Sequence, residues 1–391
     1  MQGDRQKWVR LPFQRRERRG LVSLKFCTGL LVGGSVIGSL MGSVMGGVMG
    51  SVMANASAMS QSQPQSEPAK SPIHSPMRLS NDSDPVQFTD RDRRRFRQLV
   101  RQASQEHWSQ LERGELVQRI GEFFVSTPYR AQLLEQPYLK PSRTSGERLE
   151  PLTVSFQAFD CMIFVETVLA LSQSIFQVTE DVPALEEVAR GKNPLESNLM
   201  GLEQEFLRQI EQLRYRQGRR GNYCSRLHYF SAWLQQQHAQ QQISLAVSST
   251  GAIGLPWQPQ VSFMSEHWQK YPALRQSPDL KDCITSEERQ VNAQIRQQPL
   301  RYIPTPAIAQ HYGDLRAGDV VGIVTRVKGL DTTHTGFVYR RGGSVGLLHA
   351  APQGGVQIST DLARYVGQVQ DAIGITVARP SPGNQRYNSA Q

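Results

Sequence analysis

The sequence predicts an α+β fold, with helices in the first part of the folded chain and an antiparallel sheet in the last part. Between Thr89 and about residue 236, apolar residues recur every three or four positions, as on one face of a helix. After Gly318 the pattern changes to short strand-like runs separated by glycine-rich turns. Because helices followed by a run of strands are typical of α+β domains, we expect helices packed on a sheet.

The individual elements follow from the same periodicity. Helices are expected in two runs within residues 89–126, with a break beside Gly114, and then at 159–175, at 195–213 and from about Ser225. Strands are expected at 319–325, 334–339, 344–350 and 356–358. The stretch 236–310 contains seven prolines, so it is predicted to form long surface loops, which often shape a substrate cleft.

Composition and charge exclude several classes of protein. The 391 residues are 38% hydrophobic, which is enough for a folded core and rules out a wholly disordered chain. Four cysteines are too few for a disulfide-stapled miniprotein, and no Cys-x-x-Cys pair suggests a zinc knuckle. The formal net charge is +10, but six of these charges lie in residues 1–25 beside an apolar segment. Nucleic-acid binding is therefore not supported.

The first 56 residues are predicted to be a signal peptide or a membrane anchor. Residues 26–53 carry no charge and are long enough to cross a bilayer, and the basic residues before them would stay cytoplasmic. Small residues at 54–58 resemble a signal-peptidase site, whereas a glycine at every fourth position from Gly34 to Gly50 is also a feature of helix-dimerising anchors. In both cases we expect the rest of the chain to be exported to the periplasm or cell envelope.

The remaining chain divides into a linker, a folded domain and a tail. Residues 57–85 are rich in Ser, Pro and Gln and poor in large apolar residues, so they are predicted to be a disordered linker. The folded part is expected to span residues 86–379, a size consistent with one elaborated domain. Residues 380–391 are expected to form a flexible tail.

The segment FDCMIFVE, residues 159–166, has the features of a nucleophile at the start of a helix. Asp160 can cap the helix, which places Cys161 in its first turn, where the positive helix end favours a thiolate. A cysteine with a lowered pKa is a good nucleophile at neutral pH. The alternative is a buried cysteine that packs as a small hydrophobic residue.

Two histidines in the strand region could serve this cysteine as a base and as an orienting group. If Arg341 and Gly342 form the hairpin turn, His334 lies directly opposite His349. If the turn is at Gly342 and Gly343, the two histidines are diagonal neighbours, roughly 7 to 8 Å apart. Both registers allow His334 to act as base and then acid while His349 fixes its tautomer.

Two other interpretations of the histidines remain open. They could lie on the surface of a hairpin without a chemical role. His228, His334 and His349 could also bind zinc, but no His-Glu-x-x-His run and no carboxylate at ligand spacing supports a metal site. We therefore expect a site that needs neither a metal nor an organic cofactor.

Six separated motifs together resemble the N-acetylmuramoyl-L-alanine amidase-like family, a domain-of-unknown-function group in the papain-like clan of NlpC-type cell-wall cysteine peptidases. The motifs occur in the order expected for this family, and the likeness runs from about residue 90 to 379. They are FDCMIFVE (159–166), RLHYFSAWL (226–234), FMSEHWQKYPAL (263–274), GDVVGIVT (318–325), GLDTTHTGFVY (329–339) and LLHAAP (347–352).

The resemblance implies a fold and a set of site residues. The fold would be an antiparallel sheet of the papain-like, NlpC type, with the helix of the nucleophile packed on it and an α-rich extension before it. The catalytic residues implied are Cys161, His334 and His349. The resemblance also places Asp160 beside the nucleophile and suggests that Arg226 and His228 line the substrate cleft. Asp160, Arg226 and His228 are thus the expected substrate-binding residues.

The function implied is hydrolysis of an amide bond in peptidoglycan or in muropeptides released from it. The favoured bond joins N-acetylmuramic acid to L-alanine, and the runner-up is the stem-peptide bond between D-glutamate and the diamino acid. A non-catalytic wall-binding protein and an acyl transferase are further alternatives. Membrane anchoring through residues 26–53 is possible in each case.

The other cysteines supply an expectation about the oxidation state. After export, Cys224 and Cys283 could form a disulfide, which would leave Cys161 as a free thiol. Cys283 also follows an aspartate, but the residues after it lack an apolar helical stripe. Cys161 is therefore preferred as the nucleophile.

Overall fold

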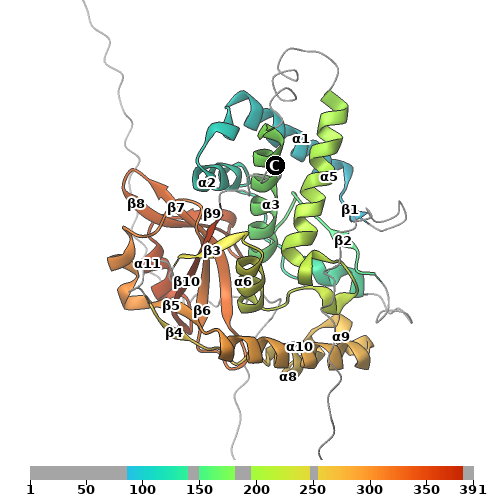
Figure 1. Cartoon of the computed structure of the whole chain (residues 1–391), viewed down its shortest axis with the longest axis vertical. Coiled ribbons are helices and arrows are strands. Elements are labelled where there is room, and N and C mark those ends of the chain that lie inside the picture. Colours follow the sequence, from blue (N-terminus) through green and yellow to red (C-terminus); the bar gives the residue numbers. More distant parts are fainter. Residues whose placement is uncertain (1–85, 140–148, 181–194, 247–253, 382–391) are drawn as a thin grey trace, which may run out of the picture. The chain divides into compact units, whose positions relative to one another are not determined.

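The computed structural model describes residues 86–139, 149–180, 195–246 and 254–381. The predicted leader and linker, residues 1–85, lie outside this range. No helix in the described part of the chain is long and apolar enough to span a membrane. Figure 1 shows a mixed α/β arrangement, in which a strongly twisted antiparallel sheet lies beside a group of helices.

The N-terminal half is helical, as the sequence predicts. The apolar stripe of the first run breaks between α1 and α2, where the chain forms the short η1 turn at Trp108–Gln110. A two-stranded parallel pair joins β1 to β2 beside these helices. The elements are β1 (Val86–Gln87), α1 (Asp90–Gln105), α2 (Arg113–Phe123), η2 (Leu133–Tyr138), β2 (Leu152–Thr153), α3 (Cys161–Glu180), α5 (Leu195–Arg214), η4 (Tyr223–Ser225) and α6 (Phe230–Ala239).

The sheet in the C-terminal half has eight strands in the order β4-β5-β10-β6-β7-β8-β9, with β3 paired to β10. Its pairings are antiparallel, which agrees with the fold class expected from the sequence. The strands are β3 (Ile243–Leu245), β4 (Leu255–Trp257), β5 (Leu300–Pro304), β6 (Val320–Thr325), β7 (Thr332–Arg341), β8 (Ser344–Ala351), β9 (Gly355–Ser359) and β10 (Ala372–Pro380).

The register of the β7–β8 hairpin decides between the two pairings that the sequence left open. Arg341 pairs with Ser344, so Gly342 and Gly343 form the turn, and both have positive φ as a two-residue hairpin turn requires. The register with His334 directly opposite His349 is therefore wrong. The two histidines are diagonal neighbours on the same face of the sheet.

Helices cover both faces of the sheet. On one face α3 packs against β7 and β8, where Phe164 contacts Phe337 with ring centroids 5.8 Å apart. On the other face lie η6 (Thr305–His311) and α11 (Leu362–Gln368), whose Leu362 shares a hydrophobic cluster with Val338. Because almost every β7 residue before Arg340 is buried, this strand is held from both sides.

The stretch from 236 to 310 is more regular than expected, and the prediction of long surface loops is wrong for most of its described part. It contains β3, β4, β5, part of η6 and the helices α8 (Phe263–Glu266), α9 (Pro272–Gln276) and α10 (Pro278–Gln297). Pro272 and Pro278 occupy first-turn positions, where a missing N–H costs nothing, so these prolines start helices. Strand β10 was also not expected, although it lies in the middle of the sheet.

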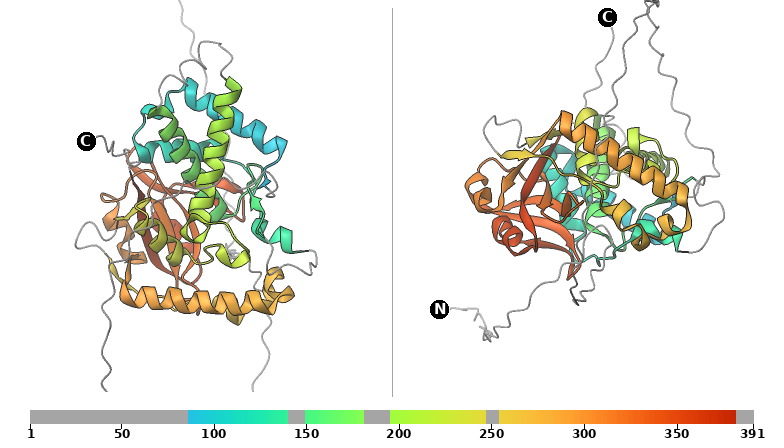
Figure 2. Two further views of the ribbon diagram at one scale, coloured as in Figure 1. Left: turned by 45° about the vertical axis from the view of Figure 1, so that its right-hand side comes forward. Right: turned by 90° about the horizontal axis from the view of Figure 1, so that it is seen from below.

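Helix α10 has an apolar stripe that the sequence analysis overlooked around Cys283. Leu280, Ile284, Val291 and Ile295 are buried at helical spacing, and the side chain of Ser277 caps the helix by accepting from the amide of Leu280. Figure 2 shows α10 as a long helix running across one end of the structure. It closes a second hydrophobic cluster together with η4, α8 and α9.

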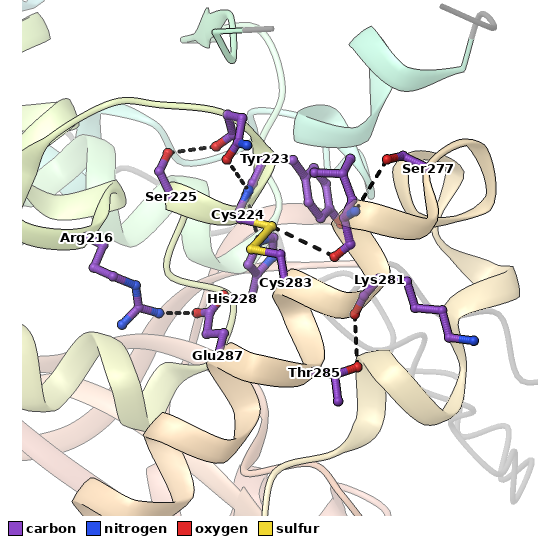
Figure 3. Close-up of a disulfide and its surroundings, with 12 residues drawn as sticks. Arg216, Tyr223, Cys224, Ser225, His228, Ser277, Lys281, Cys283, Thr285 and Glu287 are labelled. Carbon is purple, nitrogen blue, oxygen red and sulfur yellow. Dashed lines mark hydrogen bonds and ion pairs between the residues drawn. A yellow bond between two sulfur atoms is a disulfide. The ribbon is translucent and has the colours of Figure 1, made fainter. Parts of the chain in front are cut away.

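The disulfide between Cys224 and Cys283 is confirmed. Its two Cα atoms are 6.3 Å apart, and 59 positions separate the cysteines along the chain. Figure 3 shows that it ties the η4 turn to α10, with Arg216 and Glu287 forming an ion pair beside it. This cross-link fixes the segment that carries Tyr223, which forms part of the site described next.

Candidate active site

A pocket of about 140 Å³ lies where α3 begins. Its walls come from parts of the chain that are far apart in sequence: η2, the start of α3, the η4–α6 segment, α8, the residue before α9 and the start of β7. Five of the six residues predicted for the site line it directly: Asp160, Cys161, Arg226, His228 and His334. The sixth, His349, lies behind His334.

Helix α3 begins at Cys161, as the sequence predicts. The Oδ1 atom of Asp160 accepts a hydrogen bond from the amide of Ile163 at 2.8 Å, so Asp160 caps the helix. Burial raises the pKa of Asp160 to about 7. The first turn of the helix thus presents the positive end of its dipole to the pocket, next to the sulfur of Cys161.

The expectation that Cys161 is a free thiol is wrong for this structure. Its side chain is fully buried, and the cysteine is disulfide-bonded. A disulfide sulfur cannot act as an attacking thiolate. Nucleophilic chemistry at Cys161 therefore requires the reduced form of the protein.

His334 and His349 form a direct hydrogen bond. The Nε2 atom of His334 lies 2.6 Å from Nδ1 of His349, and Nε2 of His349 lies 3.1 Å from Oγ of Ser359. The two histidine rings are 1% and 0% exposed, and the ring of Tyr365 from α11 packs against His349 at 4.6 Å. The pair is therefore held rigidly on the strands β7 and β8 and is not on the surface.

Both histidines are neutral at pH 7. Burial lowers the pKa of His334 to about 4. Burial and the neighbouring His334 together lower the pKa of His349 well below its ordinary value. A neutral imidazole can take up the proton of a thiol, whereas an imidazolium cannot, so the burial keeps His334 in the form that a general base needs.

Gly336 explains how the two histidine-bearing strands come so close. A Cβ atom on residue 336 would lie 2.8 Å from Cβ of His349 and 2.8 Å from the carbonyl oxygen of Leu348. Neither neighbour is the flexible end of a side chain. The glycine two positions after His334 therefore makes room for His349.

Arg226 is buried in a cluster of charged groups. Its guanidinium contacts Oε1 of Glu135 at 2.6 Å and Oε1 of Glu150 at 3.2 Å, and it lies over the ring of Tyr223. The Nε2 atom of His228 lies 2.9 Å from the carbonyl oxygen of Tyr223. Arg226 therefore lies inside the protein, paired with two carboxylates.

His228 does not join the other two histidines as a metal ligand. Within the described part of the chain, no group of three His, Cys, Asp or Glu side chains is placed to hold a metal ion. The donor set does not fit zinc, because Nε2 of His334 and Nδ1 of His349 are hydrogen-bonded to each other and so do not face a common metal ion. We therefore derive no chemistry through a metal.

The pocket also contains buried polar atoms from residues outside the predicted site. Three buried atoms in the pocket wall have no hydrogen-bond partner among the described residues. They are Glu135 Oε2, Trp233 Nε1 and Tyr271 OH. The hydroxyls of Thr333 and Thr335, on either side of His334, are also buried in the pocket wall without a hydrogen-bond partner among the described residues. Buried polar atoms without partners are uncommon in folded proteins, and in a pocket they indicate a ligand that supplies the missing bonds.

Part of this set could have been found from the sequence. Trp233 and Tyr271 stand inside two of the quoted motifs, RLHYFSAWL and FMSEHWQKYPAL. Glu135 and Glu150 precede the nucleophile segment and belong to no quoted motif, so only the fold brings them to Arg226.

The carboxylate of Asp331 accepts hydrogen bonds from two different elements beside the site. Its carboxylate accepts hydrogen bonds from the amide of Thr332 at 2.7 Å and from the amide of Ser231 at 2.6 Å. The residue is 2% exposed. It therefore ties the start of β7, which carries His334, to the start of α6.

Fold and pocket together define a mixed α/β protein with a pocket between the start of a helix and the start of a strand, lined by apolar and polar side chains. The sequence model of the N-acetylmuramoyl-L-alanine amidase-like family matches residues 119–375, which is most of the described chain. The protein therefore belongs to the N-acetylmuramoyl-L-alanine amidase-like family. This family supports a hydrolase role with a peptidoglycan-related substrate.

Solved structures share the fold. A protein from Bacteroides uniformis ATCC 8492, described as an N-acetylmuramoyl-L-alanine amidase, is 24% identical, with 69% of this chain and 99% of that chain covered and a TM-score of 0.55. A protein from Bacteroides fragilis, described as a candidate xylanase, is 25% identical, with 67% and 99% covered and a TM-score of 0.54. A comparison with curated proteins gives no match.

Proposed function

We propose that this protein is a cysteine-dependent peptidoglycan amidase of the papain-like, NlpC type that cleaves the bond between N-acetylmuramic acid and L-alanine. One observation carries the proposal: Cys161 at the start of α3 and His334 at the start of β7 line the same pocket, and His334 is hydrogen-bonded to His349. A thiol, a neutral base and a group that orients the base are the parts that thiol-based acyl transfer requires.

The acylation step uses the thiol form of Cys161. Because Nε2 of His334 is bonded to His349, the proton of the thiol passes to Nδ1 of His334 as the sulfur attacks the carbonyl carbon of the scissile amide. The carbonyl oxygen becomes an oxyanion, and we assign its stabilisation to the backbone N–H of Cys161, because the amide of Ile163 is bonded to Asp160. When the C–N bond breaks, His334 returns the proton to the departing amine of L-alanine.

The deacylation step releases the muramoyl half of the substrate. A water molecule gives a proton to Nδ1 of His334 and attacks the carbonyl carbon of the thioester. The C–S bond then breaks, and the proton on His334 returns to the sulfur of Cys161. The products are a carboxylic acid on the sugar and a free amino group on L-alanine, with the protein unchanged.

The size and polarity of the pocket support a small residue next to the scissile bond. A volume of about 140 Å³ is close to that of an apolar protein cavity of about 150 Å³ that holds benzene. An alanyl residue with its amide fits such a space, whereas a disaccharide does not. The unpartnered donors Trp233 Nε1 and Tyr271 OH and the acceptor Glu135 Oε2 suit an amide, which both accepts and donates.

The disulfide between Cys224 and Cys283 supports export of the domain. Stable disulfides form in oxidising compartments such as the periplasm and are rare in the cytosol. Peptidoglycan lies in the same compartment. We propose that the N-terminal 56 residues direct this export, as a cleaved signal peptide or as an anchor.

A second candidate is a wall-binding protein without turnover. The observation that favours it is the disulfide-bonded state of Cys161, since a protein kept in this state retains the pocket but has no attacking thiol. The two candidates make opposite predictions about the effect of a reducing agent, so the same experiment separates them.

The test is mass spectrometry of defined muropeptides after incubation with the full-length protein, with and without a thiol reductant. We expect free stem peptide and unsubstituted glycan only with reductant, and none with Cys161→Ala. Gln353→Ala, an exposed change in the β8–β9 turn, serves as control and should behave as wild type. Cleavage within the stem would move the specificity to the endopeptidase alternative. Binding of muropeptides without any product in either condition would support the wall-binding protein.

A further inference from the structure

We infer that Ser359 is a positioning residue that selects the productive tautomer of the His334–His349 pair. Ser359 lies at the end of β9 and belongs to none of the motifs discussed above. Its hydroxyl is the third member of a continuous hydrogen-bonded series: His334 Nε2 to His349 Nδ1 at 2.6 Å, and His349 Nε2 to Ser359 Oγ at 3.1 Å. The inference rests on the proposed role of His334 as a base.

The register of β8 and β9 places the serine. His349 pairs with Gln357 and Leu347 pairs with Ser359, so Ser359 is the diagonal neighbour of His349 on the same face of the sheet. At Gly346 a Cβ atom would collide with the carbonyl oxygen of Ser359. A glycine at position 346 therefore brings the serine within reach of the histidine.

The series can be protonated in two directions. In the first, His334 carries its proton on Nε2 and donates it to His349 Nδ1, while His349 Nε2–H donates to Ser359. In the second, the serine donates to His349 Nε2, His349 Nδ1–H donates to His334, and the proton of His334 sits on Nδ1. Only the first direction leaves Nδ1 of His334 able to accept the proton of the thiol.

The surroundings of Ser359 favour the first direction. Both histidines are buried and neutral, and the titratable side chain packed on both rings is Tyr365, whose pKa burial raises. Ser359 is half-buried, so its O–H can donate to water while its oxygen accepts from His349. Without that oxygen, the first direction would leave the buried Nε2–H of His349 without an acceptor, which is unfavourable.

The test measures the tautomers directly. Full-length protein with ¹⁵N-labelled histidine is examined by NMR under reducing conditions, and the two signals are assigned with His334→Gln and His349→Gln. We expect the wild type to show unprotonated Nδ1 on both rings. Ser359→Ala should shift both rings toward protonated Nδ1, and Ser359→Thr, which keeps the hydroxyl, should restore the wild-type pattern. Thr360→Ala, at the exposed neighbouring position, is the matched control.

Kinetics provide the second measurement. General acid–base catalysis raises the reaction rate roughly 10²- to 10⁴-fold. Partial loss of the correct tautomer in Ser359→Ala should therefore lower kcat by about 10- to 100-fold and leave KM unchanged. Unchanged tautomers in a folded Ser359→Ala would overturn the inference, as would a Ser359→Thr variant that folds but resembles the alanine variant. A wild type that shows the expected tautomers but hydrolyses no muropeptide would refute the proposed function instead.

Discussion

At the scale of single residues, the site depends on a few side chains whose size and polarity are dictated by their neighbours. Gly336 is small because His349 occupies the space that a Cβ would take, and Asp160 is an aspartate because the amide of Ile163 needs an acceptor. Trp233 and Tyr271 are the opposite case, since nothing among the described residues satisfies their polar atoms. Residues of the first kind maintain the geometry, and residues of the second kind are expected to bind the substrate.

We predict that Gly336→Ala damages both stability and activity. The added Cβ would lie 2.8 Å from Cβ of His349, so the strand must shift, and overpacking of this kind costs about 1 to 3 kcal/mol. Denaturant unfolding and kcat would measure the two effects. Gly201→Ala is the control: a Cβ there meets nothing within 4 Å on the surface of α5, so stability should rise by about 0.5 to 1 kcal/mol. Equal effects of the two changes would contradict the explanation.

For Tyr271→Phe we expect stability and activity to change in opposite directions. The hydroxyl is buried without a partner, so its removal should leave the free energy of unfolding unchanged or raise it by about 1 kcal/mol. If the hydroxyl binds the substrate, kcat/KM should fall by about tenfold, the equivalent of one hydrogen bond of roughly 1.4 kcal/mol. Thermal unfolding and steady-state kinetics would measure these effects. A loss of stability with unchanged kcat/KM would show that the hydroxyl is structural.

At the scale of secondary-structure elements, the walls of the pocket are held by cross-links between helices. The Cys224–Cys283 disulfide connects η4 to α10, and the ion pair of Arg214 with Glu166 connects α5 to α3 at 2.8 Å. Both members of the ion pair are almost fully buried. Helix α3 and the segment around Arg226 are therefore each held by a link to another helix.

Removal of the disulfide by the double change Cys224→Ser and Cys283→Ser should lower stability. For cysteines 59 positions apart, the entropy of loop closure amounts to about 4 kcal/mol. We also expect a higher KM, because η4 carries part of the pocket wall. The measurements are denaturant unfolding and kinetics with and without reductant. Reductant should destabilise the wild type more than the double variant, which keeps only the disulfide of Cys161. A wild type insensitive to reductant would contradict this prediction.

Arg214→Met should be strongly destabilising. It leaves the carboxylate of Glu166 buried without its partner, and breaking a buried pair in this way costs about 3 to 5 kcal/mol. The control is Arg208→Met, which removes a surface ion pair to Glu205 on the same helix and should change stability by less than about 1 kcal/mol. Urea unfolding of both variants would test the difference, and similar values would mean that burial of the pair is unimportant.

At the scale of the whole molecule, buried ionisable groups set the dependence of stability on pH. The pKa of His334 is lowered to about 4 in the folded protein, so between about pH 6.5 and 4 the unfolded chain binds a proton that the folded protein does not. The contribution of His334 to the free energy of unfolding is therefore fully present above about pH 6.5 and is lost as the pH falls toward about 4. Asp160 and Glu287, whose pKa values burial raises to about 7, act in the opposite sense.

We therefore compare the wild type with His334→Gln, which removes the contribution of His334 together with its effect on the pKa of His349. The wild type should lose about 3 kcal/mol more than the variant between pH 7 and pH 4, because a shift of one pKa unit corresponds to about 1.4 kcal/mol. Chemical denaturation at a series of pH values would measure the difference. Parallel pH profiles of the two proteins would mean that His334 is protonated in the folded state.

Prediction from the sequence succeeded where local patterns were strong. The helical stripes of α1, α2 and α3, the strands β6 to β9 and the cap at Asp160 are all visible in spacing or in single residues. It failed for α8 to α10, since prolines that begin helices look like those that end them, and for β10, whose pairing partners lie far away in the chain. Loop-forming composition is thus a weak guide when prolines occupy first helical turns.

The sequence by itself determined the fold class, the cap that puts Cys161 at a helix start, and the pair of histidines on neighbouring strands. These follow from local chemistry: a side-chain acceptor before a helix, and the periodicity of 3.6 or 2 residues. Only the tertiary structure decided the hairpin register, the oxidation state of Cys161, and the burial of Arg226 between Glu135 and Glu150. The physical reason is that burial, pairing and pKa depend on groups that meet only when distant segments pack together.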